Sequence, residues 1–437
     1  MIWFVYNCLF PIVYLLMLPR FLIRMYRRGG YRRGFLQRLG LYDQAVISRL
    51  QSRQRIWIHA VSVGEVFVAL RFMEAVRDHR PDTAFVLTTN TSTGHAIAVK
   101  QIGPDDILLY FPVDLPLIIR RVLNRLRPQA LVLVEGELWP NLIRQANQRG
   151  IPVMLLNGRL SDRSYRRYQK IRFLIRRLLA SITLFCVQGE DERRRLIELG
   201  ADPARIRVMG SAKYDVAAAT PAPASTASTN ILRHTGLDLN AQLLVGGSTW
   251  PGEEAILLEL YQKLRTAYPA ARLVLAPRHM ERAGAVVAEI EKTGLAFQRW
   301  SVAAHMDQLA VTPAPEVLLV DTTGDLQQFY AAATIIFIGK SLTAHGGQNV
   351  IEAAVHAKPI VVGPHMENFR SVMADFLSAK ALIQVRNKQG LECTLIDLWS
   401  HADKRREYGE RARRVVRDKA GAIQASVALF LGIAENP

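Results

Sequence analysis

Two carboxylates in the first half of the sequence stand where apolar runs end. Glu65 closes the segment HAVSVGE, in which Gly64 permits a close or left-handed passage of the backbone before a helical pattern begins. Glu135 ends the run ALVLVE. A carboxylate within hydrogen-bond reach of a hydroxyl can remove its proton, so Glu65 is a candidate general base. Alternatively, Glu65 only interacts favourably with the dipole of the helix that it begins.

A second acid and a lysine accompany these residues. Glu137 follows Glu135 in the segment VEGELWP, and we expect Glu135, the last residue of the run, to face the site and Glu137 to point away. Lys213 stands in GSAKYD. It is either an ordinary surface lysine or a cation that stabilises negative charge on a departing group.

The second half of the sequence carries motifs suited to phosphate. The glycine-rich turn GGSTWPGEE at 246–254 could hold a phosphate on its backbone amides, and Arg278 after a predicted strand could form a bidentate contact. The loop at 339–350 leads into a helix in which Glu352 could accept hydrogen bonds from ribose hydroxyls, although an ordinary glycine loop with a solvated glutamate looks similar. No DxD-like pair of acids flanks these motifs, so we expect no metal and no cofactor.

Short apolar, often β-branched runs alternate with longer helical patterns in both halves, which is typical of buried parallel strands in an α/β fold. Residues 216–240 are rich in Ala, Thr, Ser and Pro and predict a linker. The sequence therefore predicts two doubly wound, Rossmann-like domains, at 41–215 and 241–437, whose strand ends face a central crevice.

The N-terminal segment predicts a membrane anchor. Residues 1–19 carry no charged side chain and are followed by Arg20, Arg24, Arg27 and Arg28. About 20 apolar residues can cross a bilayer, and the positive-inside rule keeps the arginines in the cytoplasm. We assign residues 1–40 to an anchor helix with its basic flank; a buried or interfacial helix is the alternative. In both cases we expect contact with an anionic membrane surface.

Composition limits the other partners. Lys and Arg number 56 against 38 Asp and Glu, a formal net charge of +18, so anionic partners are expected. No helix-turn-helix, RNA-recognition or zinc motif is present, which argues against nucleic acid. The three cysteines, Cys8, Cys186 and Cys393, lie far apart among apolar residues and predict free thiols.

Taken in order, the motifs resemble those of the Kdo transferases, which move 3-deoxy-D-manno-octulosonic acid (Kdo) from CMP-Kdo to a lipid A precursor. The matching segments cover nearly the whole chain: HAVSVGEV, VEGELWPN, NGRLSDRSYRRY, GSAKYD, GGSTWPGEE, APRH, DTTGDL and GKSLTAHGGQNVIEAA. The resemblance implies a glycosyltransferase-B fold, inversion at the anomeric carbon, and lipid IVA as acceptor at the cytoplasmic face of the inner membrane.

The same resemblance implies residue roles. Glu65 corresponds to the base, and Glu135 and Lys213 to transition-state stabilisers. The implied CMP contacts are Pro277, Arg278, Thr323, Gly324, Asp325, Asn349, Val350, Ile351 and Glu352. The family often has Glu at the position of Asp325 and a longer apolar residue near Thr323, so side-chain roles there do not carry over. A sugar-nucleotide epimerase of the same architecture is the alternative enzyme, and a non-catalytic nucleic-acid or membrane adaptor would account for the charge alone.

Overall fold

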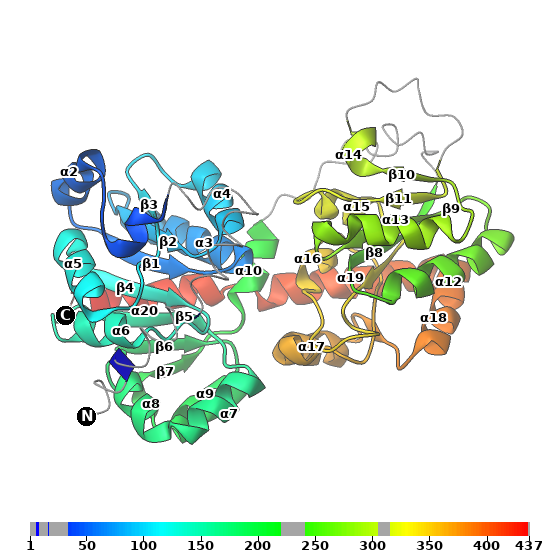
Figure 1. Cartoon of the computed structure of the whole chain (residues 1–437). Coiled ribbons are helices and arrows are strands. Elements are labelled where there is room, and N and C mark those ends of the chain that lie inside the picture. The colour runs from blue at the N-terminus through cyan, green and yellow to red at the C-terminus, as the bar shows by residue number, and fades with distance from the viewer. Residues whose placement is uncertain (1–5, 8–15, 17–33, 220–240, 305–314, 436–437) are drawn as a thin grey trace. The chain divides into compact units, whose positions relative to one another are not determined.

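The computed structural model describes residues 6–7, 16, 34–219, 241–304 and 315–435 (Figure 1). Two compact units divide the chain: unit 1 comprises residues 1–216 and 420–437, and unit 2 comprises residues 217–419. Most of the predicted anchor and nearly all of the predicted linker lie outside the described residues. Within the described part of the chain, no helix combines the length and the apolar character needed to cross a membrane.

Unit 1 contains a parallel sheet, because its short apolar runs are buried on both faces. Among the described residues the sheet has seven strands in the order β3 (Ile107–Tyr110), β2 (Phe85–Thr89), β1 (Ile56–Ala60), β4 (Ala130–Val134), β5 (Val153–Gly158), β6 (Leu184–Val187) and β7 (Ile206–Val208). In register, Ile58 lies opposite Leu87 on one side and Val132 on the other.

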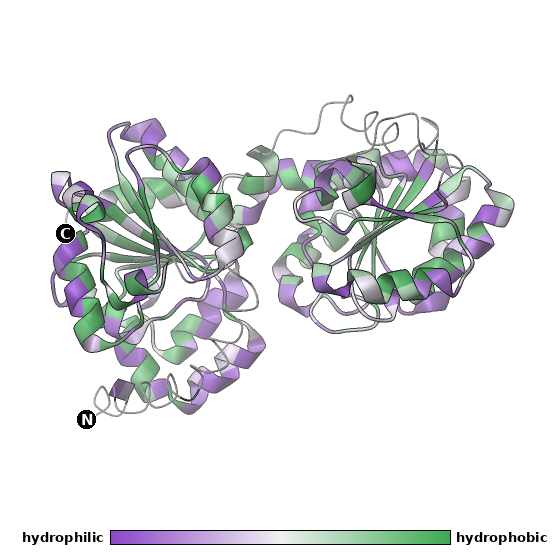
Figure 2. Ribbon diagram, turned by 45° about the horizontal axis from the view of Figure 1, so that its top comes forward, coloured by the Kyte–Doolittle hydropathy of each residue, from purple (hydrophilic) through white to green (hydrophobic). Residues whose placement is uncertain are grey.

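Helices cover both faces of this sheet. They are α2 (Gln44–Ser52), α3 (Val63–His79), α4 (Ser92–Gln101), α5 (Pro116–Leu126), α6 (Pro140–Asn147), α7 (Asp162–Lys170), α8 (Arg172–Leu179), α9 (Glu190–Leu199), α10 (Ala212–Ala219) and α20 (Ala422–Glu435). Side chains of successive strand residues pack into two separate cores. Trp57 and Leu131 belong to one core, and Ile58 and Val132 belong to the other. Figure 2 shows the apolar strands enclosed by helices whose outer faces are polar.

The last helix packs in unit 1. Ile423, Val427 and Phe430 of α20 are buried in the core that α3 shares, and the rings of Phe430 and Phe72 lie 5.4 Å apart. The Asp215 carboxylate accepts the backbone N–H of Gly421 at 2.9 Å. Residues 241–437 were all predicted to lie in the second domain, whereas residues 420–437 belong to unit 1, because this apolar helix completes a core of that unit.

Unit 2 repeats the architecture. Its described residues form a seven-stranded parallel sheet in the order β10 (Phe297–Arg299), β11 (Val317–Leu319), β9 (Ala271–Pro277), β8 (Gln242–Thr249), β12 (Ile335–Ile338), β13 (Ile360–Val362) and β14 (Ile383–Gln384). The helices are α12 (Glu253–Ala267), α13 (Ala283–Glu291), α14 (Trp300–Ala303), α15 (Leu326–Ala332), α16 (Ile351–Ala354), α17 (Arg370–Ser378), α18 (Lys388–Ser400) and α19 (Ala402–Lys419). The prediction of two doubly wound α/β domains is confirmed.

In each sheet the strand order reverses at the first strand. In unit 1 the first strand, β1, pairs with β2 on one side and β4 on the other. In unit 2 the first strand, β8, pairs with β9 and β12. The loops that leave such a pair of strands diverge, and ligands of α/β proteins bind at the carboxyl ends of the strands there. Glu65 and Glu135 follow β1 and β4, so both stand at the reversal point of unit 1.

Candidate active site

Glu65 lies in the first turn of α3 and is held by reciprocal capping. Ser62, the N-cap residue, accepts the Glu65 backbone N–H at 3.3 Å, and Glu65 Oε2 accepts the backbone N–H of Val61 at 2.8 Å. The side chain is therefore fixed against the end of β1. The expected role of Gly64 is wrong: its φ is not positive, and a Cβ built there meets nothing within 4 Å.

Glu135 and Lys213 form an ion pair beside this helix. Lys213 Nζ lies 2.7 Å from Glu135 Oε1, and the two side chains are 18% and 15% exposed. Strand β4 ends at Val134, and Glu135 takes a left-handed φ of 60°. A non-glycine residue held in this region is strained, and such strain concentrates at functional sites. The structure thus brings Lys213, from α10, to a carboxylate 78 positions earlier in the sequence.

Glu137 belongs to the same cluster. The expectation that Glu137 points away is wrong for two reasons: residues two apart share one face of a strand, and the strand has already ended at Val134. Burial and then the charge of Glu65 raise the pKa of the Glu137 carboxyl to about 7. Glu137 therefore lies within electrostatic reach of Glu65.

The pKa of Glu65 is also raised, first by burial and then by the charge of Glu135. The Val61 amide, the Ser62 hydroxyl and the Lys213 ammonium act in the opposite direction. A carboxylate whose pKa is raised toward neutrality is a better proton acceptor than an ordinary glutamate while it remains ionised. The cluster can thus supply a base and, beside it, a cation.

Asn157, just inside the end of β5, is a site residue to which the sequence analysis gave no role. It is buried, with a left-handed φ of 55°. Its Oδ1 accepts the backbone N–H of Ala212 at 3.0 Å, at the start of α10, and its Nδ2 lies 3.5 Å from Glu135 Oε1. One side chain thereby positions both members of the Glu135–Lys213 pair. The available signal was an asparagine at the end of an apolar run, since asparagine tolerates the left-handed region.

The residues predicted to contact CMP gather at the carboxyl edge of the second sheet. Pro277 ends β9, residues 323–325 follow β11, and residues 349–352 follow β12. Both Arg278 and Glu352 act electrostatically on buried Tyr330, whose pKa is raised by burial, further raised by Glu352 and lowered by Arg278.

Within this group the polar side chains hold one another. Asn349 Nδ2 donates to Glu352 Oε1 at 3.0 Å, and the Thr322 hydroxyl donates to Asp325. Val350 and Ile351 are fully buried, so only their backbone could reach a ligand.

A buried carboxylate occupies the turn that was predicted to hold phosphate. Glu253 accepts backbone N–H groups from two loops: Trp250 at 2.8 Å, Lys340 at 2.7 Å, Ser341 at 2.9 Å and Leu342 at 2.9 Å. Its side chain is fully buried. The prediction that the amides of the 246–254 turn hold a phosphate is therefore wrong for Trp250, because an internal carboxylate already accepts its N–H. The same carboxylate accepts the three amides at the start of the 339–350 loop.

Comparison with known proteins identifies the family. A family model described as 3-deoxy-D-manno-octulosonic-acid transferase (kdotransferase) matches residues 33–216. The 3-deoxy-D-manno-octulosonic acid transferase of Haemophilus influenzae is 30% identical over 400 residues, 90% of each chain. The protein of that name from Bordetella pertussis is 31% identical, over 85% of this chain and 86% of its own. The chain belongs to the Kdo transferase family.

Solved structures agree on the fold of this transferase. A glycosyltransferase from Rickettsia africae aligns with a TM-score of 0.59 at 11% identity, over 88% of this chain and all of its own. The UDP-GlcNAc 2-epimerase of Neisseria meningitidis aligns with a TM-score of 0.59 at 13% identity, over the same shares. At these identities the likeness shows the fold alone, so it does not favour the epimerase alternative over the family.

One group of side chains in the described part of the transferase could hold a metal ion. The donor atoms of His345, His365 and Glu367 all lie within 4.8 Å of one another. Both imidazoles already contact Glu367 Oε1, at 2.9 and 3.3 Å. Burial tends to raise the pKa of Glu367, but hydrogen bonds, led by that of His345, lower it to about 2. Hydrogen bonding to an ionised carboxylate accounts for this arrangement without a metal.

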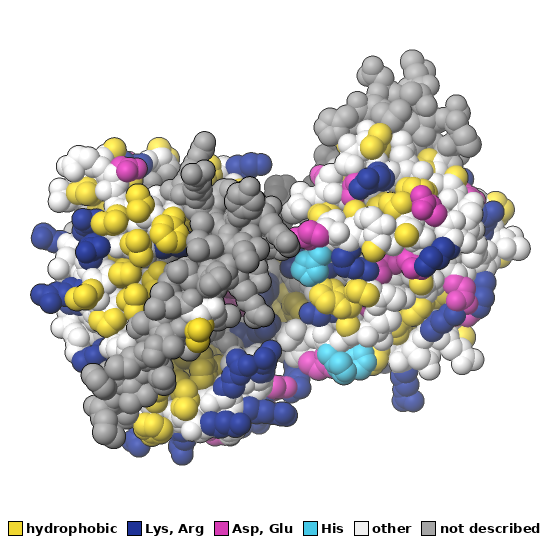
Figure 3. All heavy atoms as spheres, viewed as in Figure 1, with side chains coloured by type: hydrophobic (Ala, Val, Ile, Leu, Met, Phe, Trp, Pro, Cys, Tyr) yellow, Lys and Arg dark blue, Asp and Glu magenta, His cyan; other side chains and the backbone are white. Residues whose placement is uncertain are grey.

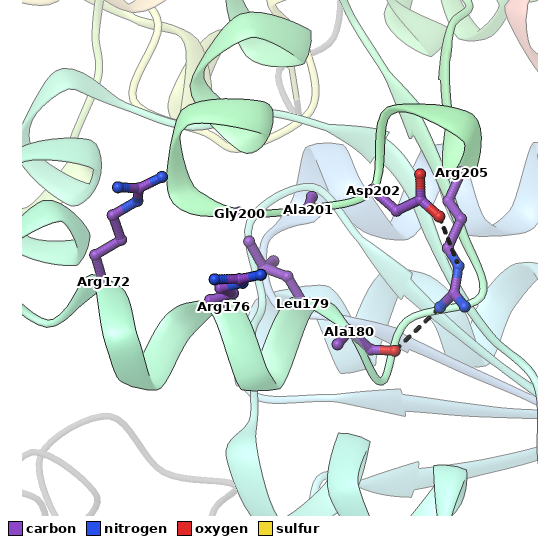
Figure 4. A pocket seen from close by; sticks show the side chains of 8 residues that line it. All are labelled: Arg172, Arg176, Leu179, Ala180, Gly200, Ala201, Asp202 and Arg205. Atoms are coloured by element: carbon purple, nitrogen blue, oxygen red, sulfur yellow. Dashed lines mark hydrogen bonds and ion pairs between the residues drawn. The ribbon is translucent and has the colours of Figure 1, made fainter.

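A cavity of about 520 Å³ that none of the clustered carboxylates lines lies between α8 and the segment that follows α9 (Figure 4). Its lining includes Arg172, Arg176 and Arg205. Figure 4 shows Arg205 directed at the Ala180 carbonyl, to which it donates at 3.0 Å, and at Asp202, 3.7 Å away. Arg205 therefore serves to cap the end of α8, and the cavity contains none of the predicted site residues.

Proposed function

We propose that this chain is an inverting transferase that moves Kdo from CMP-Kdo to the lipid A precursor lipid IVA in lipopolysaccharide biosynthesis. The observation that carries the proposal is the position of Glu65 at the reversal point of the first sheet. There its pKa is raised by burial and by Glu135, and the Glu135–Lys213 ion pair lies in the same cluster. Family membership indicates a sugar transfer. This cluster offers the proton acceptor, Glu65, and the cation, Lys213, that such a transfer needs.

In the proposed step Glu65 accepts the proton of a glucosamine 6-hydroxyl. The hydroxyl oxygen attacks the anomeric carbon of Kdo from the face opposite CMP, the bond from that carbon to the phosphate oxygen breaks, and CMP leaves with the electron pair. One displacement inverts the configuration. Lys213, held by Glu135, stabilises the negative charge that develops during departure.

The donor is proposed to bind unit 2 through the CMP contacts implied by the resemblance, Pro277, Arg278, Thr323, Gly324, Asp325, Asn349, Val350, Ile351 and Glu352. Arg278 is the cation among them, suited to a phosphate. The transfer is proposed to need no metal ion. Full activity in a strong chelator is expected, and a complete loss that Mg²⁺ restores would contradict this part.

The acceptor and the membrane are proposed to meet the basic surface of α7 and α8, at the cytoplasmic face of the inner membrane. Figure 3 shows Lys and Arg side chains gathered over this part of unit 1. Between these cations, Phe173 and Ile171 are 62% and 39% exposed. Cations beside exposed apolar side chains suit an interface of anionic head groups and acyl chains. Binding to vesicles should therefore rise with anionic lipid content and fall with salt.

The decisive experiment is mass spectrometry of lipid IVA incubated with the full-length enzyme and freshly generated CMP-Kdo. Addition of one or more Kdo masses is the expected result. Unchanged lipid IVA, together with conversion of a free nucleotide sugar to its epimer, would replace the proposal with the epimerase alternative.

A further inference from the structure

Lys340 has a strained backbone directly after β12. Its φ is 55°, in the left-handed region that glycine occupies readily and lysine does not. Two hydrogen bonds hold it there: its N–H donates to Glu253 Oε2 at 2.7 Å, and its carbonyl accepts the N–H of Gly347 at 3.0 Å. Strain of this kind persists only where the surroundings impose it, and it is concentrated at ligand sites.

The Lys340 side chain has aromatic support and lacks a counter-ion. Its ammonium lies 4.7 Å from the centroid of the Trp250 ring. Its Cε lies 3.8 Å from the point where a Cβ on Gly346 would stand. Among the residues that the structure describes, no carboxylate is within ion-pair distance of this ammonium. A half-buried lysine in this state can still take an anionic partner.

Lys340 lies just after the carboxyl end of β12, where ligands of α/β proteins bind. Strands β8 and β12 are the pair at which the strand order of unit 2 reverses, and Trp250 and Lys340 stand on the two loops that leave them. The backbone amides of both residues are already bonded to Glu253. An anion that meets these two residues must therefore be bound by their side chains, and Lys340 is the cation of the two.

We propose that Lys340 is a donor-binding residue, whose ammonium contacts an anionic oxygen of the sugar nucleotide, either the donor carboxylate or its phosphate. The inference rests on the proposed function, because that function supplies a donor with both groups. It adds to the implied CMP contacts a residue that none of the matched motifs assigns to the donor.

Lys340→Gly is the sharpest variant, because glycine keeps the left-handed backbone and removes only the side chain. The matched control is Lys380→Gly, at the end of α17, where φ is 49°. With full-length enzyme, Lys340→Gly should raise the KM for CMP-Kdo roughly tenfold or more, since a hydrogen bond to a charged group is lost. Lys340→Arg should recover most of the loss, and Lys380→Gly should stay within twofold of wild type.

Inhibition by CMP separates the two anionic groups. If the inhibition constant of CMP rises with the KM in Lys340→Gly, the ammonium contacts the phosphate; if only the KM rises, it contacts the carboxylate. A KM within twofold of wild type would overturn the inference while leaving the transferase proposal intact. If wild-type enzyme transfers no Kdo, the proposed function fails, and calorimetric titration of both proteins with CMP-Kdo still decides the role of Lys340: equal affinities would overturn it.

Discussion

The two units place a glutamate at the same topological position and use it differently. Glu65 and Glu253 each lie in the first turn of the helix that follows the first strand of their sheet. Glu65 accepts one backbone N–H, from Val61, whereas Glu253 accepts four. Glu65 lies among other carboxylates, and Glu253 lies among amides.

The number of donors decides what such a carboxylate can do. Each backbone N–H that it accepts occupies one of about four lone-pair sites on its two oxygens. A glutamate that accepts four amides is an internal counter-ion that joins two loops. A glutamate with one amide and an acidic neighbour retains the capacity to take a proton. The same fold thus yields a structural anion in one unit and a candidate base in the other.

Replacing the proposed base should have the largest effect. Glu65→Gln keeps the hydrogen bond from Val61 but cannot accept a proton, so kcat for Kdo transfer should fall roughly 10²- to 10⁴-fold while CMP binding stays unchanged. Glu74→Gln, exposed on the same helix, is the control and should keep the wild-type rate. A Glu65→Gln enzyme with half the normal rate would remove this residue from the mechanism.

Replacing Glu253, the structural carboxylate, should lower the stability of the protein. Glu253→Ala leaves four backbone N–H groups without their acceptor, which should lower the free energy of unfolding by on the order of 3 kcal/mol or more. Thermal unfolding measures the loss, and Glu259→Gln on the exposed face of the same helix provides the comparison. An unfolding midpoint equal to that of the control would show that water replaces Glu253 at no cost.

A smaller change in rate is expected at the positioning residue. Asn157→Gly preserves the left-handed backbone and removes the contacts with Ala212 and Glu135, so the Glu135–Lys213 pair loses its alignment. We expect kcat to fall roughly tenfold, with a KM for CMP-Kdo close to that of wild type. An unchanged kcat in a stably folded variant would mean that the Glu135–Lys213 pair keeps its position without Asn157.

The smallest effect concerns pH. The charge of Glu135 disfavours ionisation of Glu65, so Glu135→Gln should lower the pKa of Glu65. Because the base acts when deprotonated, the rate falls as pH drops through this pKa, and the acidic limb of kcat/KM should move to lower pH in the variant. A limb that stays in place, or that moves to higher pH, would show that the two carboxylates are not coupled.

Much of the site follows from the sequence because parallel strands gather their carboxyl ends at one edge. That rule placed Glu65 and Glu135 together, and the resemblance added Lys213. The roles of Asn157 and Glu253 depend on hydrogen bonds between segments 55 and 87 to 89 positions apart, which no local pattern encodes. The packing of α20 in unit 1 likewise depends on contacts with residues far away in the sequence, such as Phe72.

That last helix also bears on the order in which the protein is made. Most of unit 1 precedes unit 2 in the sequence, yet Phe430 and its neighbours, which complete one of the cores of unit 1, follow the whole of unit 2. Domains near the N-terminus usually fold first during translation. Here unit 1 must keep an apolar surface uncovered until α20 has been made, and by then the whole sequence of unit 2 is already present.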